Sequence, residues 1–556
     1  MNSSKKIVMA IGLVLLVLMI AVGCGGGGAP KGSDTSQEPE MQERIIRSTE
    51  ATVPVIDPGV GSDYASSIAF ANLYDTLVFP NHDGTLSPWL ATYWEADDGG
   101  LVWTFYLREG VKFHNGDELT AEDVVFSMNR MLTIGEGYGY LFSGVVKKAE
   151  ALDTHTVRFT LDKPFGPFLS TLVRLYILNA SEVMANLGDG PYGDMGDYGK
   201  NWLITNDAGS GPYMVKELKM QEYLHGTAFK DYWAGWEADA PEAFMILGTT
   251  SGQTVRTLIN RRELEITDQW QTKEALDALE KIPGVAVNSV FSGTNLNIML
   301  NTKVPPTDDV HFRRALSYVF DYDVVVDQLF PGSAKSRGPV PANLPGHNPD
   351  IPEQARNLAK AQEELAKSKY ADRLNDYPVE LVWIAEVPDE EKVAMLLQSN
   401  AGEIGIKVDV VRMPWLSFVD LVTTMENTPN ASIVFVSSHY NEAGSILESR
   451  YHSRSTGTWE QGEWLMDPEI DKAIDEAIGT VDFNERMQKY MGIQEKIVEL
   501  APTLWVFDQA EKRAYQEDYI YWPAAELTKA GKPVTSVMGY QFYYRDFKVY
   551  PDRIPK

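Results

Sequence analysis

Hydrophobic residues along this chain change repeatedly between two spacings, and this alternation most restricts the possible fold. From roughly residue 44 onward, a period of two residues, typical of strands, alternates with a period of about 3.6, typical of helices. No internal repeat is present, which excludes solenoids and propellers. The sequence therefore predicts a mixed α/β protein.

Several segments show the alternation clearly. Trp103, Phe105 and Leu107 alternate with more polar residues and predict a half-buried strand. Thr120, followed three residues later by Asp123, forms a capping-box pair that predicts a helix start. The other predicted elements are a strand at 157–161, a helix at 312–320, a helix capped by Asp323 and ending near 330, a helix at 393–402, a strand at 406–410, a helix from 468, a helix at 484–500 and a strand at 503–507.

Charge and cysteine content exclude several function classes. The 556 residues carry a net charge of −29, which repels a phosphate backbone, so nucleic acid is not an expected partner. Cys24 is the single cysteine, which excludes a disulfide framework, a thiolate zinc site and an iron–sulfur cluster. The length suits several domains.

The N-terminus has the pattern of an export signal. Lys5 and Lys6 precede an apolar run at 7–22, and small residues lead directly into Cys24. An uncleaved anchor is the alternative, but this arrangement resembles a bacterial lipobox. The resemblance implies a lipoprotein signal peptide at 1–23 and acyl chains on Cys24, which hold the mature protein outside the cytoplasm on the bilayer surface. The glycine-rich, polar residues 24–43 are predicted to form a flexible tether.

Catalytic motifs are almost absent. The sequence contains no zinc-protease helix motif, nucleophile elbow, Walker lysine loop or complete EF-hand loop. The G-x-G-x-x-G letters at 188–193 follow no clear strand and include a proline, so we interpret them as a chance match. The eight histidines are scattered and are interpreted mostly as surface or turn residues. Acid pairs at 97–98 and 390–391 are interpreted as solvated loops and helix starts. No catalytic residue, metal site or cofactor is predicted.

Two tryptophans occur where apolar alternation gives way to polar or turn residues. Trp270 lies within Asp-Gln-Trp-Gln, and Trp415 follows Met-Pro. Indole rings at such positions are able to face a cleft and stack on sugar rings or on peptide side chains without a chemical reaction. We therefore predict that both face a ligand.

A series of segments resembles family 5 extracellular solute-binding proteins, the oligopeptide- and dipeptide-binding type that serves ABC importers. The strongest similarity lies in the motif from Trp103 to Val124, and the others follow in the expected order over the whole mature body. These landmarks are residues 71–77, 83–84, 88–91, Trp94, 103–116, 119–124, 209–213, 312–316 with Asp321, and 467–471.

The resemblance implies a clamshell of the type II periplasmic-binding-protein kind, with two jaws, a hinge and an extra inserted lobe. On this sequence lobe I takes 44–79, 205–268 and 506–556. The inserted lobe II takes 80–204, and lobe III takes 269–505. A ligand between the jaws stabilises the closed form, and the importer senses that shift in population.

The resemblance is less clear about the ligand. In peptide-binding relatives an aspartate just before Tyr-Asn-Glu pairs with the α-ammonium group of the peptide. In this chain His439 occupies that place, ahead of Tyr440 and Asn441, and a neutral imidazole is a poorer partner for an ammonium group than a carboxylate. Trp415 matches a family tryptophan that lines the pocket. Alternatively, His439 only packs at a loop and another acid holds the amine.

These considerations give a set of candidate residues and an expected function. The ligand is a peptide or an oligosaccharide, with a metal chelate or an opine-like solute as further alternatives. The function expected is that of a monomeric, lipid-anchored receptor, not an enzyme, which delivers its solute to membrane permease subunits; a hydrolase, a sensor or a chaperone on the same fold is the alternative. The candidate ligand-binding residues are Trp415, His439, Tyr440, Asn441, Trp270 and Tyr64.

Overall fold

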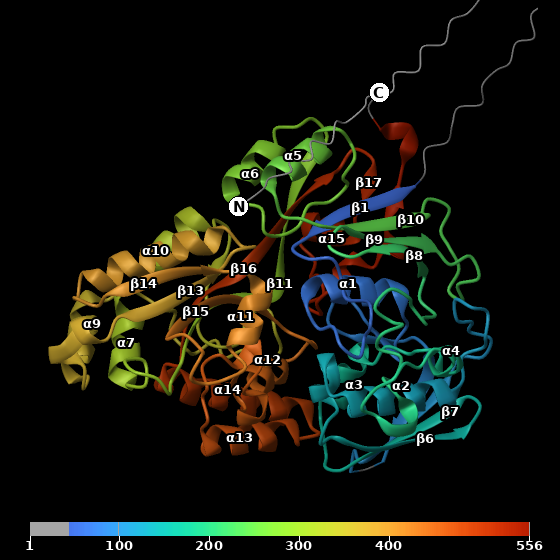
Figure 1. The fold of residues 1–556 in the computed structure, drawn as a ribbon, viewed down its shortest axis with the longest axis horizontal. Coiled ribbons are helices and arrows are strands. Elements are labelled where there is room, and N and C mark those ends of the chain that lie inside the picture. Colours follow the sequence, from blue (N-terminus) through green and yellow to red (C-terminus); the bar gives the residue numbers. More distant parts are fainter. Residues whose placement is uncertain (1–43, 98, 555–556) are drawn as a thin grey trace, which may run out of the picture. The chain divides into compact units, whose positions relative to one another are not determined.

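Three β-sheets organise the part of the chain that the computed structural model describes, residues 44–97 and 99–554 (Figure 1). The predicted signal peptide at 1–23, Cys24 and the tether at 24–43 lie outside the described residues. Helices and strands alternate along the chain, which confirms the mixed α/β prediction.

The first sheet has four strands in the order β1-β10-β9-β8. β1 pairs with β10 in parallel, and the other pairs are antiparallel. Helix α1 begins where Asp63 accepts a hydrogen bond from the backbone N–H of Ser66. The elements of this region are β1 (Ile45–Glu50), α1 (Tyr64–Leu73), β8 (Tyr213–Lys219), β9 (Tyr223–Ala228), β10 (Ala243–Gly248), α5 (Gly252–Asn260) and α6 (Lys273–Leu279).

The second sheet is a four-stranded antiparallel layer with the order β4-β5-β7-β6. β5 contains the predicted Trp103–Leu107 strand. Helix α2 begins at the predicted capping box, where the Thr120 N–H donates to the Asp123 carboxylate, and ends at Gly135 in the left-handed conformation. The elements here are β4 (Ala91–Ala96), β5 (Val102–Leu107), α2 (Ala121–Ile134), β6 (Val146–Asp153), β7 (Thr156–Leu161), α3 (Phe168–Thr171) and α4 (Ala180–Ala185).

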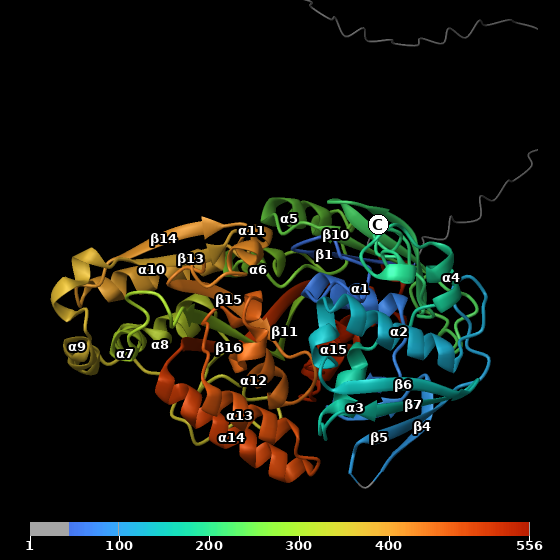
Figure 2. The ribbon, with the colours of Figure 1, turned by 60° about the horizontal axis from the view of Figure 1, so that its bottom comes forward.

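The third sheet has six strands in the order β12-β16-β11-β15-β13-β14. Figure 2 shows α12, α13 and α14 packed together beside this sheet. Its elements are β11 (Val285–Leu300), α7 (Val310–Val319), α8 (Tyr322–Val324), β12 (Ala334–Lys335), α9 (Leu358–Lys367), β13 (Val379–Ile384), α10 (Asp389–Gly402), β14 (Val408–Met413), α11 (Trp415–Leu421), β15 (Ala431–Ser437), α12 (Ala443–Tyr451), α13 (Pro468–Ile478), α14 (Phe483–Leu500) and β16 (Thr503–Gln516).

Two long strands, β11 and β16, connect the first and third sheet regions (Figure 1). Their pairing is interrupted between Phe291 and Asn295, so the two ends of the ribbon have different registers. The interruption marks the point at which the strands leave the region of β1 and enter the six-stranded sheet. Smaller elements complete the fold: β2 (Val78–Pro80), β3 (Leu86–Pro88), β17 (Ile520–Tyr521), α15 (Pro523–Lys529) and β18 (Lys548–Val549).

One helix start was predicted at the wrong aspartate. Asp323 was expected to cap the helix after 320, but the capping carboxylate is that of Asp321, which accepts from the Val324 N–H at 3.2 Å. A capping side chain reaches the N–H three residues ahead, and because the helix begins at Tyr322, Asp321 occupies the cap position. The α-helical turn then passes into a π-helical turn at Val325–Leu329.

The predicted lobes correspond in part to these sheets. The second sheet lies wholly within 80–204, and the strands of the first sheet lie within 44–79 and 205–268. The predicted boundary between 505 and 506, however, falls inside β16. The lobe assignment therefore stays a prediction. Among the described helices, none combines the length and apolar character that a membrane crossing requires.

Candidate functional site

A cavity of about 120 Å³ lies between the end of β1 and the six-stranded sheet. One wall comes from the segment after β1 and from the start of α1. The opposite wall comes from the ends of β13 and β15 and from the starts of α10 and α11. The lining residues are Glu50, Ala51, Thr52, Ser62, Asp63, Tyr64, Ala65, Gln269, Trp270, Ile384, Glu386, Val387, Glu390, Trp415, Val434, Phe435, Ser437, His439, Trp459 and Met538.

Three indole rings line this cavity. Trp415, the first residue of α11, meets Trp459 edge-on with 5.0 Å between ring centroids. Trp270 packs against Phe435 at 5.2 Å on the side nearer the β11–β16 ribbon. Rings held by such contacts present fixed faces to a ligand.

Four carboxylates line the same cavity, and each already accepts an internal hydrogen bond. Asp63 caps α1, and the Glu386 Oε2 atom accepts from the Trp415 N–H at 3.0 Å. The Glu390 Oε2 atom accepts from the Ile384 N–H at 2.8 Å. Glu390 begins a helix as predicted, but the expectation that it is solvated is wrong, because only 1% of the residue is exposed. The hydrogen bond to the end of β13 draws this side chain inward.

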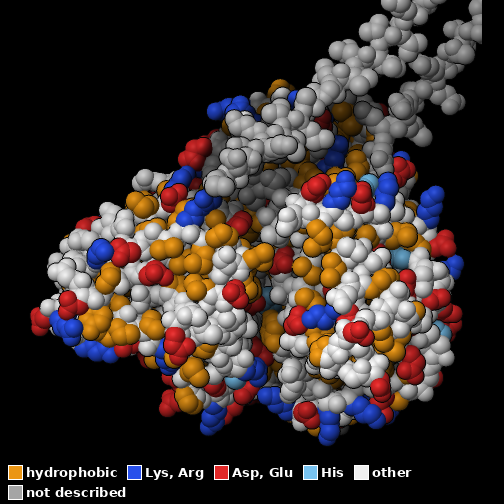
Figure 3. Space-filling view, viewed as in Figure 1, with side chains coloured by type: hydrophobic (Ala, Val, Ile, Leu, Met, Phe, Trp, Pro, Cys, Tyr) orange, Lys and Arg blue, Asp and Glu red, His pale blue; other side chains and the backbone are white. Residues whose placement is uncertain are grey.

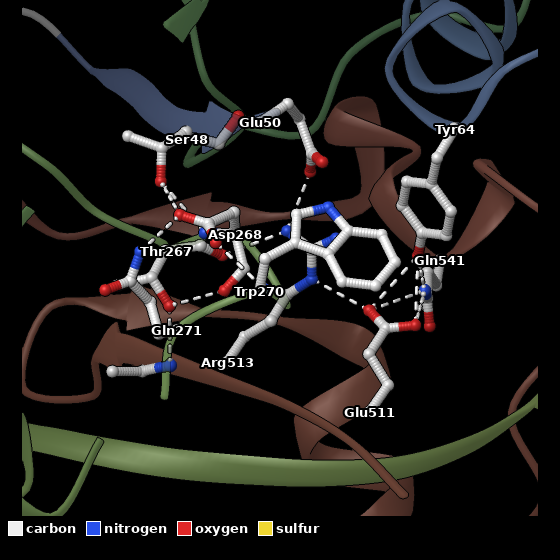
Figure 4. A network of polar contacts seen from close by, with 12 residues as sticks. Ser48, Glu50, Tyr64, Thr267, Asp268, Trp270, Gln271, Glu511, Arg513 and Gln541 are labelled. Carbon is white, nitrogen blue, oxygen red and sulfur yellow. Dashed lines mark hydrogen bonds and ion pairs between the residues drawn. The ribbon is translucent and has the colours of Figure 1, made fainter. Parts of the chain in front are cut away.

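Glu50, the fourth carboxylate, belongs to a buried network around Arg513 (Figure 4). Arg513 donates to Glu50 at 2.7 Å and to Glu511 at 2.8 Å, and Figure 4 shows these two acids on opposite sides of the guanidinium group. The Tyr64 hydroxyl donates to Glu511 at 3.1 Å. Burial, against the attraction of Arg513, raises the pKa of Glu50 to about 7.

Asp268 extends this network toward Trp270. Its carboxylate accepts hydrogen bonds from Thr49, Gln271 and the Trp270 N–H, at distances of 2.8 to 2.9 Å. These bonds fix the backbone that carries the Trp270 ring. The network therefore positions one wall of the cavity as well as binding β1 to β16.

The His439 side chain pairs with Glu460, an acid 21 residues away in the sequence. Its Nε2 atom lies 2.9 and 3.0 Å from the two oxygens of Glu460. The rings of Tyr138 and Tyr140 meet the imidazole edge-on, and Arg174 donates to its backbone carbonyl at 2.7 Å. The imidazole therefore has one nitrogen engaged inside the protein.

Three of the eight histidines have buried side chains. His439 is 1% exposed and His452 is 8% exposed, and the His114 side chain pairs with Asp207 in a buried site. Each is stabilised by carboxylates that the sequence order does not bring near it. No group of three or more metal-ligating side chains occurs in the part of the chain that the structure describes.

Four of the six predicted ligand-binding residues lie together in this cavity: Tyr64, Trp270, Trp415 and His439. The other two lie outside its lining. Tyr440 is fully buried, and Asn441 donates to the Gly84 carbonyl and accepts from the Ser536 hydroxyl. Sequence reasoning missed Glu50, Glu386 and Trp459, which have no local motif. That the six candidate residues contact a ligand stays a prediction.

A second cavity of about 360 Å³ adjoins the first, beside the β11–β16 ribbon. The two cavities share Gln269, Trp270, Val387 and Phe435 in their linings. The Trp270–Phe435 pair therefore stands between them. The second cavity also contains lysines, including Lys512 of β16, whereas the lining of the first contains neither lysine nor arginine.

The Arg174 side chain joins two distant segments of backbone next to His439. Arg174 donates both to the His439 carbonyl and to the Met538 carbonyl, the latter at 3.0 Å. On the face shown in Figure 3, a narrow seam is visible, and charged side chains of both signs are scattered rather than gathered in one patch.

Comparisons with known proteins cover most of the chain. The sequence model of bacterial extracellular solute-binding proteins, family 5 Middle, matches residues 85–458. A probable D,D-dipeptide-binding periplasmic protein DdpA of Escherichia coli is 26% identical over 498 residues, which covers 87% of this chain and 93% of the relative. Heme-binding protein A of Haemophilus influenzae is 26% identical over 481 residues, or 80% of this chain and 82% of the relative.

A solved structure shows the same fold. The periplasmic binding protein DppA of Helicobacter pylori, in complex with the peptide STSA, aligns with a TM-score of 0.78. The alignment covers 91% of this chain and 98% of that protein at 22% sequence identity. The type II periplasmic-binding-protein architecture expected from the sequence is therefore confirmed.

Proposed function

The chain belongs to the bacterial extracellular solute-binding proteins of family 5, and from this premise we propose that it captures a peptide and delivers it unchanged to an ABC importer. The observation that carries the proposal is the cavity between β1 and the six-stranded sheet, whose walls combine indole rings with hydrogen-bonding side chains. Such a lining binds a small polar ligand without requiring a reaction.

The choice of peptide over oligosaccharide has support from the relatives. DdpA of Escherichia coli is named as a dipeptide-binding protein, and DppA of Helicobacter pylori holds a peptide in its structure. The heme-binding relative shows that ligands vary among similar proteins. Peptide is therefore the first ligand class to test.

The proposed mechanism is a change in the population of open and closed forms. Lobe I contributes Glu50 and Tyr64 to the cavity, and lobe III contributes Trp415 and His439. A ligand that contacts both walls binds the closed form more tightly than the open form and so favours closure. The β11–β16 ribbon, with its change of register, is the proposed hinge.

The proposed location is the outer face of a membrane. The signal pattern at 1–23 and the single Cys24 support export and lipid attachment through 24–43. A receptor held in this way stays near its permease while its body samples solution.

Ligand screening tests the proposed function. The full mature chain, unfolded and refolded to remove a carried-over solute, is screened by thermal shift against pools of dipeptides to pentapeptides and against oligosaccharides. We expect peptides to raise the melting temperature and to be recovered chemically unchanged by mass spectrometry. Stabilisation by oligosaccharides alone refutes the peptide assignment, and conversion of the bound peptide refutes the receptor function.

A further inference from the structure

The first cavity, of about 120 Å³, is lined by acidic side chains and by no basic lysine or arginine. Its lining includes the carboxylates of Glu50, Asp63, Glu386 and Glu390 and three indole rings, but no lysine or arginine. We propose that this cavity binds an organic cation, an ammonium or guanidinium group carried by the ligand, and that Glu390 is its principal counter-ion. The inference rests on the proposed function only in taking that cation to be part of a peptide.

Glu390 is the buried carboxylate of this lining for which no ion pair is found among the described residues. Only 1% of the residue is exposed, and its Oε2 atom accepts a hydrogen bond from the Ile384 N–H. Its Oε1 atom accepts none from the described residues, and no described lysine, arginine or histidine forms an ion pair with it. A buried carboxylate without a cation is costly, so burial favours the protonated form of Glu390 until a ligand cation compensates the ionised form.

Burial raises the pKa of the Glu390 carboxyl well above its ordinary value, against the effect of the hydrogen bond from Ile384. The neighbouring Glu386 charge acts in the same direction as burial. A bound cation favours the ionised form, so binding is expected to release a proton from this group.

The other charged groups around the cavity do not supply the missing positive charge. Glu50 pairs with Arg513, but that guanidinium also serves Glu511 and lies outside the cavity lining. Asp63 is used as a helix cap, and His439 has its Nε2 atom against Glu460. The lining therefore holds no lysine or arginine that would repel a ligand cation or already compensate Glu390.

The indole walls favour the same ligand chemistry. Trp270, Trp415 and Trp459 all line the cavity, and the face of an indole ring attracts cations more strongly than other aromatic side chains do. A site that combines carboxylates with aromatic faces binds ammonium and guanidinium groups through charge and through ring contacts together.

The size of the cavity restricts it to one group of the ligand. About 120 Å³ is close to the roughly 150 Å³ cavity that holds a benzene molecule, and it is smaller than pockets for whole ligands, which start near 300 Å³. The second cavity, which shares Trp270 and Phe435 with the first and includes Lys512, is the proposed place for the remainder of the ligand. The arrangement suits a ligand with a cation at one end.

This assignment differs from the one implied by the family resemblance. The resemblance places the amine at position 439, but His439 is already engaged by Glu460. Glu390, from the start of α10, offers a carboxylate to the same cavity from a different element. The structure therefore assigns cation recognition to a residue that the motif comparison does not identify.

Calorimetric titration of the full mature chain tests the inference with matched peptides. The probes are Ala-Ala, N-acetyl-Ala-Ala, N-acetyl-Lys-Ala and N-acetyl-norleucyl-Ala. We expect the cation-bearing probes to bind at least about 10-fold more tightly than N-acetyl-norleucyl-Ala, which carries no cation. If acetylation of Ala-Ala lowers its affinity, the bound cation is the terminal ammonium group. If N-acetyl-Lys-Ala binds more tightly than its norleucyl analogue, the bound cation is the lysine side chain.

Two variants separate a binding role of Glu390 from a structural one. Glu390→Gln keeps an oxygen acceptor for Ile384 and is expected to weaken binding of the preferred cationic probe by about 10- to 100-fold. Glu391→Gln changes the adjacent, exposed acid of the same helical turn and is expected to have no effect. The binding enthalpy of the wild type is expected to depend on the ionisation enthalpy of the buffer, and this dependence disappears in Glu390→Gln.

Two outcomes overturn the inference while leaving the peptide proposal intact: equal affinity for the charged and uncharged probes, or equal affinity of the Glu390 and Glu391 variants. If no peptide binds, the proposed function fails and the inference is tested alone by tryptophan fluorescence with n-butylammonium and, as its neutral counterpart, 1-butanol. A response to n-butylammonium that Glu390→Gln abolishes supports the inference. No such response, or an equal response to the alcohol, refutes it.

Discussion

Replacing Glu50 with glutamine is expected to change how the stability of the protein depends on pH. Glu50 is 1% exposed and pairs with Arg513 at 2.7 Å. Burial raises its pKa to about 7, and the nearby negative charges of Asp268 and Glu511 act in the same direction while Arg513 opposes them. Glutamine keeps an oxygen acceptor for Arg513 but does not titrate.

The direction of the effect follows from the two pKa values. An unfolded glutamate has a pKa of about 4.5, so between about pH 4.5 and pH 7 the folded protein binds a proton that the unfolded chain does not. The corresponding stability is fully present below the unfolded pKa and is lost as the pH rises through about 7. A shift of this size corresponds to about 3 kcal/mol in the wild type and to none in Glu50→Gln.

Thermal unfolding of the full chain at about pH 4 and about pH 8 measures this difference. For a body of about 500 residues, 1 kcal/mol corresponds to about 1 °C, so the melting temperature of Glu50→Gln relative to wild type should rise by about 3 °C between the two pH values. Glu222→Gln, at an exposed position, serves as the control. A difference between wild type and Glu50→Gln that does not change with pH refutes the reasoning.

Three further predictions concern the cavity, the anchor and the packing. Trp415→Ala removes one indole wall and should weaken ligand binding about 10-fold or more while leaving the melting temperature of the ligand-free protein nearly unchanged. Titration with the peptide that binds best measures the affinity, and an unchanged affinity shows that Trp415 does not contact the ligand. Cys24→Ser should release the protein from membranes into the soluble fraction on cell fractionation, and continued attachment contradicts lipidation. Gly209→Ala places a Cβ atom 1.9 Å from the Leu73 carbonyl oxygen and should destabilise the protein by about 1–3 kcal/mol. The control Gly402→Ala meets nothing within 4 Å and should be neutral or slightly stabilising in the same thermal scan. Equal melting temperatures of the two variants argue against the close packing at Gly209.

The sequence predicted best what depends on residues close together in the chain. The capping box at Thr120 and the alternation at Trp103–Leu107 each involve neighbours within a few positions, and both elements occur where expected. The cap at Asp321 instead of Asp323 shows the limit of this approach. Two aspartates lie two residues apart, and only the backbone path decides which one reaches the free N–H.

Burial and the choice of partner required the tertiary structure. Nothing in the local sequence distinguishes Glu390, which points inward, from its neighbour Glu391, which stays in solvent, because both follow the same proline and both are favourable near a helix start. Likewise, His439 pairs with Glu460, which is 21 residues away in the sequence, and Glu50 pairs with Arg513, which is 463 residues away. Such pairings depend on which strands become neighbours.

The sequence by itself determined the fold class, the family and the residue types available for recognition. The tertiary structure alone decided which of them share a cavity: Tyr64, Trp270, Trp415 and His439 meet there, and Tyr440 and Asn441 do not. The physical reason is that periodicity and capping are local, whereas a binding cavity is formed by side chains from distant segments whose charge and burial are set only when the sheets pack together.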